Sequence, residues 1–147
     1  MLVVSVLFVS CSAQNQKTGS KEPVFRYIQV GWNTKIHLGD PITKANGYLV
    51  NASGKFVMNP TLFGGIVIEL VPDSANKITE MRFTYGPETD YSTFWKDYTS
   101  TLGAPTIKED HVFWDDGKTR FEIYKAIPNE RPRITSRLFD KKNQTSF

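Results

Sequence analysis

The feature that most constrains how this 147-residue chain can fold is its single cysteine, Cys11. One cysteine cannot form a disulfide within the chain, and it cannot assemble a multi-cysteine zinc site. The folded part must therefore be stabilised by a hydrophobic core. The composition allows this, because 39% of the residues are hydrophobic and 13% are aromatic. A chain of this length suits one domain.

Cys11 directly follows a short apolar run, residues 2–9, and one serine. An apolar run that ends in small residues and a cysteine resembles the signal of a bacterial lipoprotein, in which the cysteine is acylated and becomes the mature N-terminus. Phe8 is bulkier than the usual residue of such a signal, and no positively charged segment precedes the run. A start upstream of Met1 would supply that charge.

We predict a lipoprotein signal peptide over residues 1–11 and a flexible tether over residues 12–23, because the tether is polar and has no apolar side chain to bury. A single domain over 24–140 and a frayed tail over 141–147 follow. The palmitate-type anchor places the protein at the outer membrane, facing the periplasm. Two alternatives stay open: cleavage after Ala13, which would give a secreted protein, and a signal-like segment that is an ordinary strand.

Aromatic residues recur at helical spacing in the second half of the chain. The positions are Tyr91, Phe94, Trp95, Tyr98 and Leu102. Thr89 and Asp90 offer an N-cap before them, and Gly103 and Pro105 end the pattern. The spacing predicts one amphipathic helix over about 89–102 whose aromatic face packs in the core.

Alternating patterns predict strands on both sides of this helix. They form hairpins over 47–57, 65–85 and 111–124, with a first strand over 24–32 and a final strand over 133–139. The predicted fold class is α+β, an antiparallel sheet of hairpins packed against one main helix.

Asp116-Gly117 predicts a two-residue turn in the hairpin over 111–124. In the resulting register Asp115 faces Lys118 and His111 faces Glu122. Side chains then alternate between a core face and a solvated face. We assign Val112, Trp114, Phe121 and Ile123 to the core face.

The solvated face of the sheet is the candidate binding surface. Its proposed contact residues are Phe113, Lys118, Arg120, Arg133, Arg137 and Phe139. Arginine and aromatic residues are typical of binding hot spots, although a mixed-charge face is also typical of an ordinary solvated surface. The partner would be an envelope protein or an anionic polymer, in addition to the membrane that holds the lipid anchor.

His111, beside Glu109 and Asp110, is the nearest approach to a catalytic group. The sequence has no Gly-x-Ser-x-Gly nucleophile elbow, and a cross-strand pair with Glu122 explains the histidine. His37 and His111 have no metal-ligand spacing. We therefore expect no catalytic residue, no metal and no cofactor. The net charge of +3 does not argue for nucleic acid.

A family resemblance rests on three consecutive features: the helix ending Leu102-Gly103-Ala104-Pro105, the hairpin with Trp114-Asp115-Asp116-Gly117, and the short closing strand. This order resembles small α+β lipoproteins of Bacteroidota-type bacteria. Over Tyr91 to Phe139, about a third of the chain, it is also similar to the outer-membrane assembly lipoproteins of the SmpA/OmlA type. The earlier hairpin over 65–85 departs from that second family. The resemblance implies an envelope lipoprotein and carries over no functional residue.

These observations predict a lipid-anchored envelope module that binds or assembles without catalysis. Two other functions stay open. One is an extracytoplasmic hydrolase that uses His111, and the other is a carrier of a small apolar ligand held between sheet and helix.

Overall fold

The computed structural model describes residues 24–30, 34–45, 48–50, 54–58 and 65–143. It has one large antiparallel sheet, a two-stranded sheet and one helical segment, so the predicted α+β class is confirmed. The predicted signal peptide and tether lie outside the described residues. No helix in the described part of the chain is long and apolar enough to span a bilayer.

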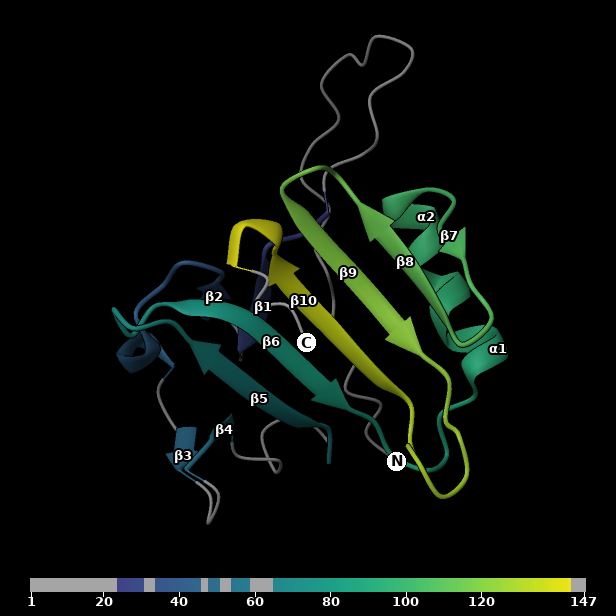
Figure 1. Cartoon of the computed structure of the whole chain (residues 1–147), viewed down its shortest axis with the longest axis horizontal. Helices are drawn as coiled ribbons and strands as arrows, with labels where there is room; N and C mark the ends of the chain where they lie inside the picture. The colour runs from purple at the N-terminus through teal and green to yellow at the C-terminus, as the bar shows by residue number, and fades with distance from the viewer. Residues whose placement is uncertain (1–23, 31–33, 46–47, 51–53, 59–64, 144–147) are drawn as a thin grey trace, which may run out of the picture.

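The large sheet has 8 strands in the order β3-β4-β5-β6-β10-β9-β8-β7 (Figure 1). Their bounds are β3 (Tyr48–Val50), β4 (Phe56–Met58), β5 (Val67–Pro72), β6 (Ile78–Thr84), β7 (Thr106–Ile107), β8 (His111–Asp115), β9 (Thr119–Tyr124) and β10 (Thr135–Asp140). The three predicted hairpins are the pairs β3–β4, β5–β6 and β8–β9. The last strand, β10, lies between β6 and β9 and joins the two halves of the sheet.

Two short elements precede the large sheet. β1 (Tyr27–Val30) and β2 (Thr34–His37) pair with each other, and a 3-10 turn, η1 (Ile42–Lys44), follows. Ile28 and Ile36 are buried, which shows that this hairpin contributes to the main core.

The predicted helix over 89–102 is divided into three consecutive turns: α1 (Tyr91–Phe94), η3 (Trp95–Tyr98) and α2 (Thr99–Leu102). Asp90 is the N-cap and accepts a hydrogen bond from the Ser92 amide. The Thr99 hydroxyl donates to the Lys96 carbonyl at 2.6 Å, a local bond that competes with regular helix geometry. At Gly103 the backbone takes a positive φ of 76°, which ends the segment.

The aromatic side of this helical segment packs on the core face of the sheet, as predicted. The Phe94 ring lies 4.5 Å from that of Tyr85, and the Tyr98 ring lies 5.0 Å from that of Phe121. The Trp114 indole donates to the Gly103 carbonyl at 2.9 Å, so the helix end is fixed to β8.

The register predicted for the β8–β9 hairpin is wrong by two residues. Asp115 lies opposite Arg120 rather than Lys118, and His111 lies opposite Tyr124 rather than Glu122. The turn is centred one residue later because the Asp116 carboxylate accepts the amides of Lys118 and Thr119.

A shift of two residues leaves every side chain on its predicted face. The core assignment is therefore confirmed, and Val112, Trp114, Phe121 and Ile123 are all buried.

Two predicted boundaries need correction at the end of the chain. β10 begins at Thr135, and the exposed Arg133 precedes it. Lys141, which we expected to be frayed, starts a 3-10 turn, η4 (Lys141–Asn143), and its amide donates to the Lys118 carbonyl at 2.9 Å.

A hydrogen-bonded pair in the core offers a stability test. The hydroxyls of Tyr85, directly after β6, and Ser136 on β10 lie 2.8 Å apart, and both residues are buried. Tyr85→Phe should lower the free energy of unfolding by about 1–2 kcal/mol, because the Ser136 hydroxyl loses its partner in a buried site. Urea denaturation measures the change.

Tyr91→Phe is the matched control. The Tyr91 hydroxyl is also buried but has no hydrogen-bond partner among the described residues. Its removal should change the free energy of unfolding by less than about 0.5 kcal/mol or increase it. Equal losses in the two variants would contradict the assignment.

Candidate functional site

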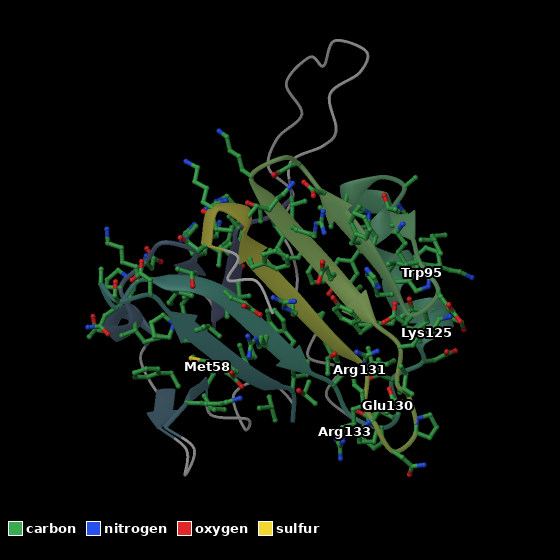
Figure 2. The ribbon with its side chains drawn as sticks, in the orientation of Figure 1. Met58, Trp95, Lys125, Glu130, Arg131 and Arg133 are labelled. Atoms are coloured by element: carbon green, nitrogen blue, oxygen red, sulfur yellow. The ribbon has the colours of Figure 1, made fainter. Side chains whose placement is uncertain are left out.

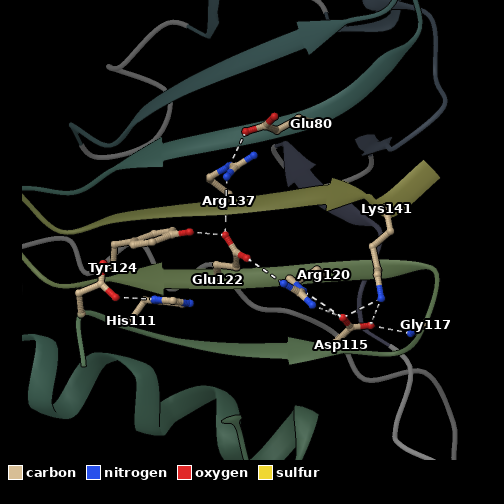
Figure 3. Close-up of polar contacts among 10 residues, drawn as sticks. Glu80, His111, Asp115, Gly117, Arg120, Glu122, Tyr124, Arg137 and Lys141 are labelled. Atoms are coloured by element: carbon tan, nitrogen blue, oxygen red, sulfur yellow. Dashed lines mark hydrogen bonds and ion pairs between the residues drawn. The ribbon is translucent and has the colours of Figure 1, made fainter. Parts of the chain in front are cut away.

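A continuous row of charged side chains crosses the sheet face opposite the helical segment, and Figure 3 shows the part of it from Glu80 to Lys141. In spatial order this charged row consists of Lys55, Glu69, Arg82, Glu80, Arg137, Glu122, Arg120, Asp115 and Lys141. Successive members have opposite charge, and their closest nitrogen–oxygen distances lie between 2.6 and 3.7 Å. The row extends from the start of β4 to β8 and so spans most of the sheet.

Strand register explains the order of the row. Arg137 on β10 lies directly opposite Arg82 on β6 and opposite Glu122 on β9. Two arginines in opposite positions repel each other. Glu80 relieves this repulsion because it accepts from the Nε atoms of Arg82, at 2.6 Å, and Arg137, at 2.7 Å.

Glu122 has the same bridging role on the other side of β10. Its carboxylate lies 3.7 Å from Arg137 and 3.5 Å from Arg120, and it accepts from the Tyr124 hydroxyl. The Glu122 side chain is only 5% exposed. Because an unpaired carboxylate with so little exposure would be costly, the two arginines stabilise Glu122 in this position.

Aromatic rings lie beside the arginines of the row. The Arg120 guanidinium lies 4.5 Å from the Phe113 ring centre, and that of Arg137 lies 4.7 Å from the Phe139 ring. These contacts hold the planar guanidinium groups against the sheet.

His111 continues this aromatic packing. Its ring stacks between Phe113, at 5.8 Å, and Tyr124, at 4.8 Å. The Arg131 guanidinium covers the Tyr124 ring at 4.8 Å. Ring faces in this stack are therefore occupied by neighbouring side chains.

Basic neighbours lower the pKa of two carboxyl groups of the row, those of Glu80 and Asp115. Burial alone would raise the pKa of Glu80, but hydrogen bonds from Arg82 and Arg137 outweigh it and hold the pKa below its ordinary value. At Asp115 burial also acts to raise the pKa, yet bonds from Lys141, the Gly117 amide and Arg120 lower it to about 2.

The structure brings together four of the six residues predicted for the binding surface. Phe113, Arg120, Arg137 and Phe139 share the face of the charged row. The other two lie elsewhere: Lys118 in the β8–β9 turn and Arg133 in the connection between β9 and β10.

Two properties of this face differ from the expected free, basic surface. Its arginines are paired with carboxylates, and Phe139 is only 2% exposed. Sequence reasoning missed Glu69, Glu80 and Arg82, although the alternation along β6 places Glu80 and Arg82 on the polar face. Finding them required the pairing of β6 with β10.

His111 has a partner that sequence reasoning did not assign. Its Nδ1 lies 2.7 Å from the Asp110 carboxylate, and this hydrogen bond lowers the pKa of Asp110. The side-chain contacts of His111 among the described residues are with Asp110, Phe113 and Tyr124. None of these is the serine, threonine or cysteine nucleophile that a hydrolase of the expected type requires.

A hollow of about 380 Å³ is lined by the start of α1 and by the segments that follow β6, follow β9 and precede β10. Its lining includes Asp90, Lys125 and Arg133, and the last two lie at the same end of the sheet in Figure 2. The other lining residues are uncharged and include Tyr91, Ala126 and Ile134, so the hollow has both charged and apolar walls. Elsewhere in the described residues, no group of three or more His, Cys, Asp or Glu side chains could hold a metal ion.

No protein-family model matches the chain, and no curated protein or solved structure matches it.

Glu122 provides a test of the charged row. Glu122→Gln should lower the free energy of unfolding by about 3 kcal/mol, because Arg120 and Arg137 lose the carboxylate that lies between them at a buried position. Lys55→Gln is the control at the exposed end of the row, where the Lys55 side chain is 50% exposed. That change should be below about 0.5 kcal/mol in denaturant unfolding. Similar small losses for both variants would show that the row contributes little.

Asp115 predicts an acid dependence of stability. Its pKa in the folded protein, about 2, lies below its ordinary value of 3.8. The ionised carboxylate therefore stabilises the fold above pH 4, and this contribution is lost as the pH falls from about 4 to about 2. Asp115→Asn should flatten the pH dependence of the unfolding free energy in that window. A slope equal to that of the unaltered protein would contradict the assignment.

Proposed function

We propose that the protein is a lipid-anchored, non-catalytic binding module of the cell envelope that docks a partner protein on the face of the charged row. The observation that carries this proposal is the fixed geometry of the row. Its arginine side chains are oriented by carboxylates and aromatic rings while parts of them still reach the surface. The exposed fraction is 35% for Arg82 and 28% for Arg120.

Preorganisation supports a binding role for physical reasons. Ordering a flexible side chain at an interface costs about 0.5–1.5 kcal/mol, and side chains that are already held lose less freedom. Arginine and aromatic residues are also enriched among the residues that dominate binding energy. A face that presents arginines held in fixed positions on aromatic rings therefore suits specific docking.

The charge balance of the row favours a protein partner over an anionic polymer. The row contains five cations and four anions in strict alternation. A uniformly negative polymer would meet four carboxylates as well as the cations. A protein surface with both signs can match such a pattern, and that match gives specificity.

The anchor rests on the sequence around Cys11. An apolar run followed by a small residue and cysteine supports acylation, and several acyl chains together give stable membrane attachment. We propose the outer membrane, with the domain in the periplasm; a secreted, unlipidated form is the alternative.

Photo-crosslinking in the native cells tests the docking face. A photoreactive amino acid at Val67, which is 37% exposed on the face of the row, should give a discrete crosslinked partner. The same amino acid at Thr93, exposed on the helical segment, is the control and should not. The intact mass of the membrane-extracted protein should correspond to a chain that begins at acylated Cys11.

Three results would contradict the proposal. Equal crosslinking at Val67 and Thr93 would rule out this docking face, and so would its absence at both positions. A mature chain that begins at Gln14 without lipid would rule out the anchor.

A further inference from the structure

Three segments meet at one end of the sheet. The Val24 amide, at the start of the described chain, donates to the Asp116 carboxylate in the β8–β9 turn at 2.9 Å. The Lys141 amide of η4 donates to the Lys118 carbonyl of the same turn at 2.9 Å. Figure 1 shows the start of the described chain close to this turn. The segment that leads from Cys11 therefore enters the domain at this end.

The carboxylates at this end are bonded to groups of the domain itself. Asp116 accepts three backbone amides, from Val24, Lys118 and Thr119. Asp140 accepts from the Arg26 guanidinium at 3.0 Å and also from a backbone amide of η4.

Two lysines at this end have ammonium groups without a bonded partner among the described residues. Lys118 and Lys142 are exposed, and neither ammonium group forms a hydrogen bond or ion pair with a described residue. They belong to the turn and to η4, which the bond between Lys141 and Lys118 holds together. The uncommitted charge at this end of the domain is therefore positive.

We infer that this end faces a membrane surface and that Lys118 and Lys142 contact anionic phospholipid headgroups. The inference rests on the proposed lipid anchor at Cys11. A flexible segment of the length of residues 12–23 has a root-mean-square reach of about 20 Å, which keeps the entry point at Val24 near the bilayer. Basic side chains are attracted to anionic headgroups within a Debye length, so the two lysines select the orientation of the tethered domain.

This orientation is compatible with docking at the charged row. The lysines lie at the ends of strands, whereas the row lies on the broad face of the sheet and runs across the strands. A domain held at its strand ends does not turn that face toward the membrane, so a partner can reach it.

Lysine acetylation of the full-length lipidated protein tests the inference. The protein is placed in vesicles of phosphatidylcholine, or of phosphatidylcholine and phosphatidylglycerol in equal parts, and modified residues are counted by mass spectrometry. Modification of Lys118 and Lys142 should be slower by about threefold or more on the anionic vesicles. Lys96, on the helical segment, and Lys108, before β8, are exposed away from this end of the sheet; they are internal controls and should not change. At 1 M salt, where the Debye length is about 3 Å, the protection should disappear while the protein stays on the vesicles.

The possible results distinguish a failure of the inference from a failure of the proposed lipid anchor. Anchored protein whose Lys118 and Lys142 react equally on both vesicle types overturns the inference alone, as does equal protection of all four lysines. Protein that fails to float with neutral vesicles and lacks acyl mass overturns both the anchor and the inference.

Discussion

The central sheet depends on the neutralisation of Arg137. β10 can lie between β6 and β9 only if this side chain is accommodated, because its register places it opposite Arg82 on one side. Glu80 on β6 and Glu122 on β9 flank the Arg137 guanidinium, and their carboxylates balance its positive charge. Both carboxylates are buried, so neither would be stable without the arginines. The joining of the two halves of the sheet and the order of the charged row therefore have the same physical cause.

Buried polar groups on the two faces of β10 are stabilised in different ways. On the core face Ser136 is fully buried and bonds to the Tyr85 hydroxyl, a neutral pair that burial tolerates. Burial raises the pKa of Tyr85 to about 12, so the hydroxyl stays protonated and can share its hydrogen with Ser136. On the opposite face the acidic side chains are paired with basic ones. β10 thus contributes Ser136 to a neutral hydroxyl pair in the core and Arg137 to the charged row on the opposite face.

Local patterns in the sequence predict much of this fold, and long-range pairing limits the rest. Helical spacing from Tyr91 to Leu102, and alternation along β6, β8 and β9, identify those elements and their core faces correctly. The register of the β8–β9 turn was wrong because the Asp116 side chain, rather than residue propensity alone, decides which residues are central. The position of β10 beside β6 was not predicted, since pairing between distant strands leaves no local signal. Glu69, Glu80 and Arg82 were missed for that reason, and so were the carboxylate partners of Arg120 and Arg137.

The distribution of charge also explains why net charge is a poor guide to the partner. The chain has a net charge of +3, yet the cations on the broad sheet face are matched by carboxylates at short distance. Lys118 and Lys142 remain uncommitted at the strand ends, next to the point where the chain enters the domain. A paired row provides a fixed pattern that another protein can match, whereas exposed lysines with no bonded partner among the described residues are attracted to any nearby negative surface. The paired cations of the row therefore suit contact with a protein, and the exposed lysines suit contact with a negatively charged surface.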